Sequence, residues 1–245
     1  MNKCPKVSIV TVTYNCVGTV EQTICNVLGQ TYPNIEYIVI DGASTDGTRE
    51  VIEKYASRLD YWVSEPDKGI YDAMNKGIKA ATGEWILFRN AGDYFFKLTT
   101  VEDVFNWYED RGEDLITGGM RCFYSHGYKD SVYKYADVVV WQNAYIKHPA
   151  TFIRLSIQKS EMYPTDYKIA SDYYFFQKLV LRGASMAVYD GIIALFDNET
   201  GISSTNILQS WQEITDIRKR LGAPWKVLLK SRIRCLCIRI RNLMK

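Results

Sequence analysis

The first ninety or so residues repeat one pattern four times, and this repeat limits the fold more than any other feature of the sequence. In each unit a short apolar stretch is followed by a polar turn and then by apolar residues at helical spacing. Stretches that are apolar at consecutive positions and rich in β-branched residues are typical of strands covered on both faces. The pattern therefore predicts a parallel sheet with helical crossovers. The predicted strands are residues 6–13, 35–40, 60–64 and 85–88.

Acidic side chains follow three of these strands directly. Asp41 and Asp46 come after the second strand, Asp67 after the third and Asp93 after the fourth. The carboxyl ends of parallel strands meet at one edge of the sheet, which is where open α/β sheets bind ligands. A carboxylate at that edge could hold a divalent cation that bridges phosphates. For Asp93 alone, a role in the turn or in capping the next helix is the alternative.

Two common nucleotide-binding motifs are absent from the sequence. The first strand is not followed by G-x-G-x-x-G, and G-x-x-x-x-G-K-[ST] does not occur. Residues 14–18 are neither glycine-rich nor basic, which disfavours a nucleotidyltransferase. A nucleotide bound at this edge would have to be held by acids and a metal ion.

The cysteines and the first residues indicate the compartment. Six cysteines and two histidines show no spacing typical of a zinc or iron–sulfur site, so we expect reduced thiols in a cytoplasm. The chain opens MNKCPKVSIV and enters its first predicted strand without a signal segment. No stretch reaches the roughly 18 apolar residues of a membrane span. We therefore expect neither export nor a transmembrane helix.

Several segments together resemble bacterial family 2 glycosyltransferases with the GT-A fold. They are VSIVTVTYN, QTYPNIEYIVIDGASTDGT and DYWVSEPDKGIYDAMNKGIKAATGEWILFRNAGD, followed later by HPATFIR and IASDYYFF. The resemblance covers residues 6–200. It implies an α/β fold with a mixed, mostly parallel sheet, a sugar-nucleotide donor such as a UDP-sugar, a divalent metal (Mn²⁺ or Mg²⁺) and inversion at the anomeric carbon. The implied acceptor is a hydroxyl of a glycan or of a polyprenyl-linked glycan in cell-surface polysaccharide synthesis.

The resemblance also implies a role for each matching position in donor binding. Positions at the end of the first strand would meet the base and ribose, Asp41 would bond the base, and the following loop belongs to the same site. The EPDKG segment would line the nucleotide pocket. The implied donor-binding residues are Thr13, Tyr14, Asn15, Asp41, Ser44, Asp46, Asp67, Lys68 and Asn90.

The metal motif departs from the family pattern. Asp93 matches the last acid of the family's DxD motif, but Ala91 stands where the first acid is expected. A single carboxylate anchors Mg²⁺ or Mn²⁺ poorly without phosphate oxygens and a further ligand. His148 is the candidate for that ligand, because a neutral imidazole suits Mn²⁺ and the family often places a metal-contacting histidine near here. A hydrogen-bonded histidine before a proline is the alternative, and a non-catalytic sugar-nucleotide-binding or scaffold protein remains the alternative for the whole chain.

Asp172 is the expected catalytic base. It lies in IASDYYFF, which matches the acidic motif that supplies the base in the family, with Ser171 replacing the more usual Glu. A carboxylate in that position would take the proton of the attacking hydroxyl. The alternative is that Asp172 caps the helix that begins there.

Residues 94–147 are less informative. We expect a helix at 101–108, a strand at 115–117, and strands or loop in the tyrosine-rich run 123–135. The tyrosines could stack on sugar rings of an acceptor, or they could be ordinary residues of a half-exposed sheet.

The C-terminal segment is strongly basic. Ten of the 30 lysines and arginines, but no acid, lie from Ile217 onward, so the preceding part carries 20 basic and 28 acidic residues. After a helix at about 205–221, residues 225–245 place five aliphatic side chains on one helical face. They are Leu229, Ile233, Leu236, Ile240 and Leu243.

This amphipathic pattern favours a helix that lies on an anionic inner-leaflet membrane surface rather than a nucleic-acid-binding domain. Packing of the apolar stripe on the acidic body is the alternative. We expect a GT-A domain over residues 1–222 and a basic tail over 223–245. The protein would be cytoplasmic and peripheral on the inner membrane.

Overall fold

The protein is described by a computed structural model, which covers residues 4–132, 141, 146–199 and 201–243. Its centre is one mixed sheet with nine strands among these residues, in the order β3-β2-β1-β4-β8-β6-β9-β5, and β7 pairs with β6. The strands are β1 (Val7–Thr13), β2 (Ile35–Asp41), β3 (Tyr61–Ser64), β4 (Trp85–Phe88), β5 (Tyr94–Phe95), β6 (Leu115–Tyr124), β7 (Gly127–Ser131), β8 (Thr151–Arg154) and β9 (Met186–Asp197).

The four predicted strands form the parallel half of the sheet. β1 lies between β2 and β4, and β3 pairs with the other side of β2, all in parallel register. Every residue of β1 and of β4 is buried, as consecutive apolar positions predicted. The parallel sheet, its strands and the α/β fold class are confirmed.

The other half of the sheet is mostly antiparallel. β8 pairs antiparallel with β4 and with β6, and β9 runs parallel to β6. The short strand expected at 115–117 is only the beginning of β6, which continues to Tyr124 and is bulged at Gly119. The sequence pattern predicted no strand at residues 186–197, which form β9. Within the tyrosine-rich run, β7 is a strand, and residues 133–135 lie outside the described residues.

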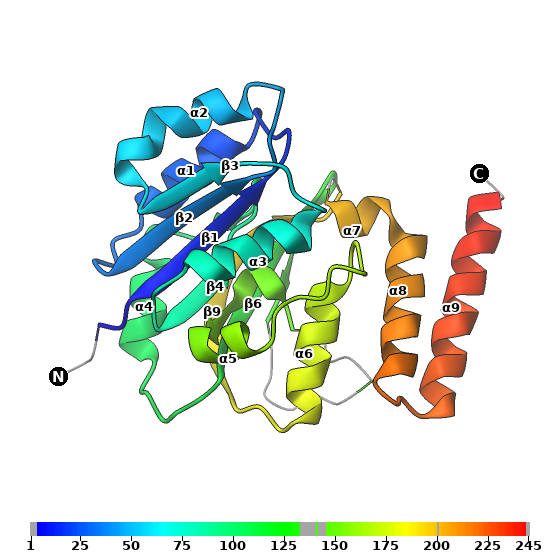
Figure 1. Ribbon diagram of the computed structural model, residues 1–245. Helices are drawn as coiled ribbons and strands as arrows, with labels where there is room; N and C mark the ends of the chain where they lie inside the picture. Colours follow the sequence, from blue (N-terminus) through cyan, green and yellow to red (C-terminus); the bar gives the residue numbers. More distant parts are fainter. Residues whose placement is uncertain (1–3, 133–140, 142–145, 200, 244–245) are drawn as a thin grey trace.

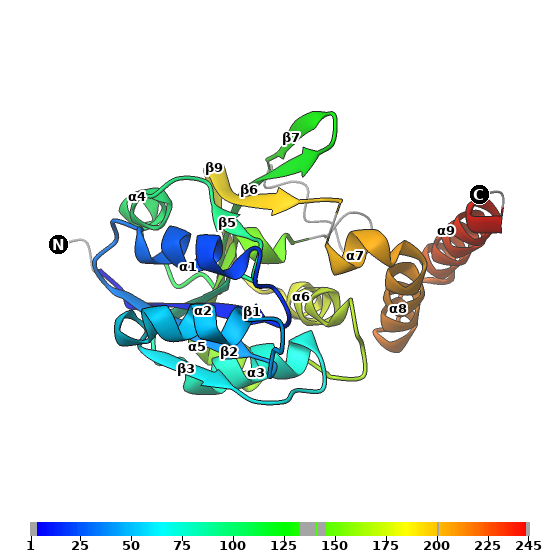
Figure 2. The same ribbon diagram turned by 90° about the horizontal axis from the view of Figure 1, so that it is seen from above.

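Helices cover both faces of the sheet (Figures 1 and 2). The helices α1, α2 and α4 pack on one face, and α3, α5 and α6 pack on the other, so the core consists of two apolar layers. These helices are α1 (Val20–Leu28), α2 (Thr48–Tyr55), α3 (Ile70–Ala80), α4 (Thr100–Trp107), α5 (Leu155–Ser160) and α6 (Ser171–Leu181).

The C-terminal helices form a pair at one end of the molecule (Figure 1). A short α7 (Ile202–Thr205) leads into α8 (Ile207–Arg220), and α9 (Trp225–Leu243) returns alongside α8. Ser231 of α9 is buried against α8, where its hydroxyl accepts a hydrogen bond of 2.7 Å from Nη1 of Arg218. The expected C-terminal helix is therefore present, and it packs on α8 through the side that contains Ser231.

The apolar stripe of α9 faces away from α8. The side chains that the sequence grouped on one face are each about half exposed or more, which their separation from Ser231 around the helix explains. The alternative in which this stripe packs on the body is therefore wrong. Among the described residues, no helix is both long enough and apolar enough to cross a membrane.

Candidate functional site

A large cleft opens at the edge of the sheet where β1 and β4 end. Its volume of about 840 Å³ falls in the range, roughly 300–1,000 Å³, of small-molecule sites. Its walls come from the ends of β1, β4 and β9, the start of α3, the 3₁₀ turn before β8 and the loop before α6. Eight predicted site residues line it, namely Thr13, Tyr14, Asp67, Lys68, Asn90, Asp93, His148 and Asp172.

The other four predicted residues build the loops behind this wall. Asp41 is fully buried, and its carboxylate accepts hydrogen bonds from the backbone N–H and hydroxyl of Ser44 and from the hydroxyl of Ser64. Asn15 has a left-handed backbone (φ 51°), and its Oδ1 accepts a 2.9 Å bond from the N–H of Thr45. These contacts tie the turn after β1 to the turn after β2.

Asp46 fixes the same pair of turns from the other side. Its carboxylate accepts hydrogen bonds from the N–H groups of Val17 and Thr48, both 3.0 Å long. The hydroxyl of Thr48 is the main cause of a lowered pKa for Asp46. Direct contact between a donor and Asn15, Asp41, Ser44 or Asp46 stays a prediction.

The carboxylate of Asp67 lies where a side chain at position 42 would be, and Gly42 leaves this space open. A Cβ added at Gly42 would lie 2.4 Å from Oδ2 of Asp67, so any larger residue would displace the carboxylate. Oδ1 of Asp67 accepts a 2.8 Å hydrogen bond from the N–H of Gly69. The carboxylate is thereby held at the cleft beside Lys68.

Two buried polar atoms in the cleft wall lack a hydrogen-bond partner in the described part of the chain. They are Oγ1 of Thr13, at the end of β1, and Oδ1 of Asn90, just after β4. Unsatisfied buried polar atoms are rare in folded proteins. Their position on adjacent strand ends is suited to a polar ligand that completes their hydrogen bonding.

Asp93 is a buried carboxylate with an altered pKa. Burial raises its pKa to about 7, although the positive charge of Arg89 acts in the opposite direction. Arg89 is itself fully buried, with its guanidinium carbon 4.0 Å from the ring centroid of Phe95. Burial lowers the pKa of Arg89 to about 10, so its side chain is a cation at neutral pH. The sequence motifs did not identify this buried charge.

His148 is set among aromatic rings with one ring nitrogen bonded. Its Nε2 lies 2.9 Å from the hydroxyl of Tyr163, and that hydroxyl donates to Oε1 of Gln158 at 3.3 Å. In the tautomer in which the tyrosine proton goes to Gln158, Nε2 of His148 is the donor and Nδ1 keeps its lone pair. Burial lowers the pKa of His148 to about 3, which keeps the ring neutral. His148 can therefore form a hydrogen bond through Nε2 and still bind a metal through Nδ1.

The chemistry of these two side chains fits a divalent metal only in part. Asp93 offers carboxylate oxygens and His148 a neutral imidazole nitrogen, both on the wall of one cleft. In the ranges that the structure describes, no group of three or more His, Cys, Asp or Glu side chains could hold a metal ion. A metal bound here would need further oxygens, such as those of a diphosphate.

Asp172 lies in the first turn of α6. Ala170 is the residue that caps this helix, so the interpretation of Asp172 as the N-cap is wrong. Oδ1 of Asp172 accepts hydrogen bonds from the hydroxyl of Tyr71, at 2.9 Å, and from the N–H of Tyr173, at 2.8 Å. Burial raises the pKa of this carboxyl above its ordinary value, while the bond from Tyr71 lowers it.

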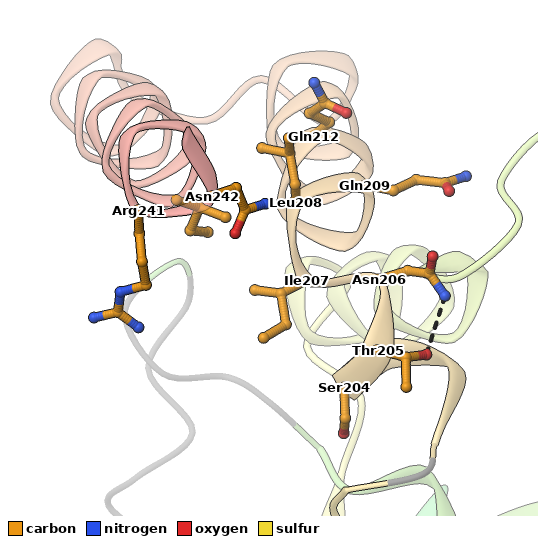
Figure 3. Close-up of a pocket in the computed structure, with 10 residues that line it drawn as sticks. Ser204, Thr205, Asn206, Ile207, Leu208, Gln209, Gln212, Arg241 and Asn242 are labelled. Atoms are coloured by element: carbon orange, nitrogen blue, oxygen red, sulfur yellow. Dashed lines mark hydrogen bonds between the residues drawn. The ribbon is translucent and has the colours of Figure 1, made fainter. Parts of the chain in front are cut away.

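A second hollow of about 540 Å³ lies between the start of α8 and the last turns of α9 (Figure 3). Polar side chains from both helices line it, including Gln209, Gln212, Arg241 and Asn242. None of the predicted site residues contributes to its wall. Of the two hollows, only the larger cleft is lined by predicted site residues.

Comparison with known sequences identifies the family. The family model described as Glycosyl transferase family 2 matches residues 8–197. A PGL/p-HBAD biosynthesis glycosyltransferase of Mycobacterium bovis is 26% identical over 234 residues, which cover 93% of this chain and 91% of that protein. The uncharacterized glycosyltransferase Rv1514c of Mycobacterium tuberculosis is 40% identical over 96 residues, and this match spans 39% of this chain and little more than a third (37%) of that relative.

Comparison with solved structures identifies the fold. Residues 1–349 of TarS from S. aureus, in complex with UDP-GlcNAc, align with a TM-score of 0.71 at 22% identity, over 89% of this chain and 67% of that one. The mannosyltransferase PcManGT of Pyrobaculum calidifontis, in complex with GDP-Man and Mn²⁺, aligns with a TM-score of 0.70 at 20% identity, over 94% and 70%. The sheet order, the cleft at the strand ends and the matched family model lead to one conclusion: this chain belongs to glycosyltransferase family 2 and has the GT-A fold.

Proposed function

We propose that this enzyme transfers a sugar from a nucleotide donor, a UDP-sugar, to a hydroxyl of a glycan or polyprenyl-linked acceptor, with inversion at the anomeric carbon. The observation that carries the proposal is that Asp172 and Asp93 line one cleft at the carboxyl ends of the strands. The same wall contains the unsatisfied polar atoms of Thr13 and Asn90. The residues proposed as the base, as the carboxylate ligand of the metal and as polar contacts of the nucleotide therefore line one cleft.

The transfer would be a single displacement. The acceptor oxygen forms a bond to the anomeric carbon as the bond from that carbon to the diphosphate oxygen breaks, and the bonding electrons leave with the nucleoside diphosphate. The carboxylate of Asp172 takes the proton of the attacking hydroxyl. The hydrogen bond from Tyr71 orients this carboxylate.

Asp93 and His148 are the residues that would hold a divalent metal. When bound, such an ion supplies positive charge next to the leaving diphosphate. The solved complex of PcManGT with GDP-Man and Mn²⁺ supports a metal in this fold. In this chain, a hydrogen bond donated by Tyr163 to Gln158 and one donated by Nε2 of His148 to Tyr163 would keep Nδ1 of His148 available as a ligand atom.

A UDP-sugar is favoured as donor by the TarS complex with UDP-GlcNAc. Asp67, Lys68 and Tyr14 would form the nucleotide end of the cleft, with Asn15, Asp41, Ser44 and Asp46 shaping its loops. A role in a biosynthetic pathway is favoured by the M. bovis relative, a PGL/p-HBAD biosynthesis glycosyltransferase. The non-catalytic alternative, which Ala91 and Ser171 favour, predicts nucleotide binding without turnover.

Release of UDP from a panel of UDP-sugars in the presence of Mn²⁺ tests the proposal. We expect turnover by the wild type and a loss of at least about 100-fold in kcat for Asp172→Asn, because proton transfer by a positioned base contributes at least that much. The dissociation constant of UDP should stay close to the wild-type value. Asp166→Asn is the matched control, because Asp166 is exposed on the same loop and pairs only weakly with Arg220.

Two results would contradict this assignment. If Asp172→Asn turned over the donor as fast as the wild type, another group would be the base. If the wild type bound UDP but released none from any UDP-sugar, the binding or scaffold function would replace the transferase.

We also propose that α9 binds an anionic membrane surface on the cytoplasmic side. Its exposed stripe includes Leu229, Ile233, Leu236 and Ile240, each close to half exposed, and Trp225 at 68%. Basic residues flank the stripe, and each is worth about 1 kcal/mol near an anionic surface. Because the opposite side of α9 is fixed to α8 through Ser231, the stripe can contact a membrane without unfolding the body.

Cosedimentation of the full chain with phosphatidylglycerol vesicles tests this surface. The double variant Ile233→Glu/Leu236→Glu should lose most binding, because it places two carboxylates on the stripe, whereas Leu98→Glu, at an exposed leucine of the body, should not. Equal binding by the wild type and the double variant would show that α9 is not the contact.

A further inference from the structure

One carboxylate of α8 receives three consecutive backbone amides from the loop that precedes Asp172. Oε2 of Glu213 accepts hydrogen bonds from the N–H of Ile169, at 2.9 Å, and of Ala170, at 3.0 Å. Oε1 accepts a 3.1 Å bond from the N–H of Lys168 and another from the side-chain amide of Gln209. Hydrogen bonds to an ionised carboxylate are stronger than neutral ones, so this loop is firmly held.

The same loop is also held from the opposite side. The hydroxyl of Tyr71, on α3, lies 2.7 Å from the carbonyl oxygen of Ile169 and 2.9 Å from Oδ1 of Asp172. Ala170 is the N-cap of α6, and Asp172 lies two residues further on. The position of the Ala170 amide therefore determines where the first turn of α6, with Asp172, lies in the cleft.

Further contacts fix α8 itself beside the cleft. Ile214 and Ile217 pack with Ala170 and Tyr173 in a separate apolar cluster. Nε of Arg218 donates a 2.8 Å hydrogen bond to the hydroxyl of Tyr173. Glu213 therefore projects from a helix that packs directly against the start of α6.

We propose that Glu213 is a positioning residue for sugar transfer, which holds residues 168–170 so that the carboxylate of Asp172 faces the reacting centre. This proposal rests on the proposed role of Asp172 as the base. The cleft residues expected to hold the donor, such as Thr13, Asn90 and Asp93, make no hydrogen bond with Glu213 among those of the described residues. Loss of Glu213 should consequently affect the chemical step and leave donor binding unchanged.

Two variants of the full chain test the proposal. In Glu213→Ala the three amides lose their acceptor, and we expect kcat for UDP release from a UDP-sugar to fall by about 10- to 100-fold, the loss typical of a small misplacement of a reacting group. The dissociation constant of UDP with Mn²⁺ should stay within about twofold of the wild-type value, since the variant changes the position of the base and not the contacts of the nucleotide. Glu213→Gln keeps one acceptor oxygen and should recover part of the loss.

Hydrogen exchange supplies a readout that does not depend on turnover. The amides of Lys168, Ile169 and Ala170 should exchange faster in Glu213→Ala than in the wild type, and to an intermediate degree in Glu213→Gln. Gln212→Ala, an exposed neighbour on the same helix, should match the wild type in exchange and in kcat. If Glu213→Ala does not fold, Glu213→Gln provides the same comparison.

The outcomes separate this proposal from the proposed function. Wild-type kcat in Glu213→Ala, together with an inactive Asp172→Asn, would overturn only the positioning role. A rise in the UDP dissociation constant that accounts for the whole loss of activity would also overturn it, because Glu213 would then serve donor binding. Absence of turnover by the wild type, or full activity of Asp172→Asn, would overturn the function on which it rests.

Discussion

Burial is the main influence on the titratable side chains of the cleft. It raises the pKa of Asp172 above its ordinary value and that of Asp93 to about 7, and it lowers the pKa of His148 to about 3. In each case the neutral form gains because a charge in a poorly solvated site is costly. A more basic carboxylate is a better proton acceptor, so burial suits the role proposed for Asp172.

The pH dependence of activity follows from the groups around Asp172. The base works when ionised, so kcat should fall as the pH is lowered through the raised pKa of Asp172. Tyr71 from α3 lowers that pKa by donating a hydrogen bond, whereas the charge of Glu213 from α8 raises it, and Tyr163 lies close enough to interact with the carboxylate. Tyr71→Phe should therefore move the acidic limb of the kcat profile to higher pH.

The measurement is the pH profile of UDP release by the wild type and Tyr71→Phe. Tyr61→Phe, at an exposed position in edge strand β3, is the control and should keep the wild-type profile. An acidic limb that stays in place or moves to lower pH in Tyr71→Phe would contradict the assignment of Asp172.

Glu36 is a buried carboxylate with a structural role. Burial alone would raise its pKa, but hydrogen bonds from Lys6, Ser8 and Thr82 outweigh this effect and lower the pKa to about 2. Glu36→Gln should lower the free energy of unfolding by about 2 kcal/mol, because it weakens bonds to a charged group and leaves a buried partner unsatisfied. Because the pKa is lower in the folded state, this stabilisation is present above about pH 4.5 and is lost as the pH falls toward 2.

Urea unfolding of the two proteins between pH 3 and pH 7 measures this difference. Glu53→Gln is the control, since the pair of Glu53 with Arg49 is about half exposed and contributes at most about 0.5 kcal/mol. If the difference in unfolding free energy between the wild type and Glu36→Gln grew as the pH was lowered, the assigned role of Glu36 would be wrong.

At the level of elements, α3 lies unusually close to the sheet. A Cβ added at Gly77 would be 2.4 Å from Cγ1 of Val10 in β1. Alanine in place of a helical glycine normally gains up to about 1 kcal/mol. Here the overlap with a short, buried side chain should cost about 1–3 kcal/mol, so Gly77→Ala should be less stable than the wild type.

Thermal or urea unfolding of Gly77→Ala measures whether the overlap with Val10 outweighs the higher helix propensity of alanine. Gly18→Ala is the matched control, because no heavy atom lies within 4 Å of the added Cβ at that position. A stabilised Gly77→Ala would show that α3 can move away from β1 at little cost.

The elements that the sequence predicted are those whose pattern is local. The bounds of the strands β1 to β4 were predicted to within one residue, and helical crossovers were predicted between them, since apolar runs, turns and helical spacing follow one another along the chain. β9 was missed because its burial is irregular and its partner, β6, is distant in sequence and bulged at Gly119. The extent of β6 was underestimated for the same reason.

In the candidate site, too, local motifs were predicted and contacts between distant residues were not. Motifs identified eight of the residues that line the cleft, Asp93 and Asp172 among them, but not Tyr71, Tyr163 or Glu213, whose contacts define the geometry. The hydrogen bond from Tyr71 to Asp172 spans 101 positions of the chain, and those from the loop to Glu213 span more than 40. A single sequence carries no signal for such pairs, because either residue could satisfy its hydrogen bonds elsewhere.

At the scale of the whole molecule, the sheet edge and the C-terminal pair lie next to each other. The loop before Asp172 contacts α8 through Glu213, and α8 contacts α9 through Arg218 and Ser231. The proposed membrane surface is therefore connected to the wall of the cleft by direct contacts. This arrangement would keep the site at a fixed height above a membrane that holds the acceptor.

We propose above that the cleft binds a nucleoside diphosphate together with a divalent metal. Thermal unfolding with UDP, GDP, dTDP and CDP, each with and without Mn²⁺, tests it most directly, because a ligand bound only by the folded state raises Tm. We expect a rise with UDP that requires Mn²⁺ and that disappears in Asp93→Asn, while Asp103→Asn, on the partly exposed side of α4 and outside the cleft wall, behaves like the wild type. Absence of a shift with every nucleotide, with or without Mn²⁺, would contradict the claim.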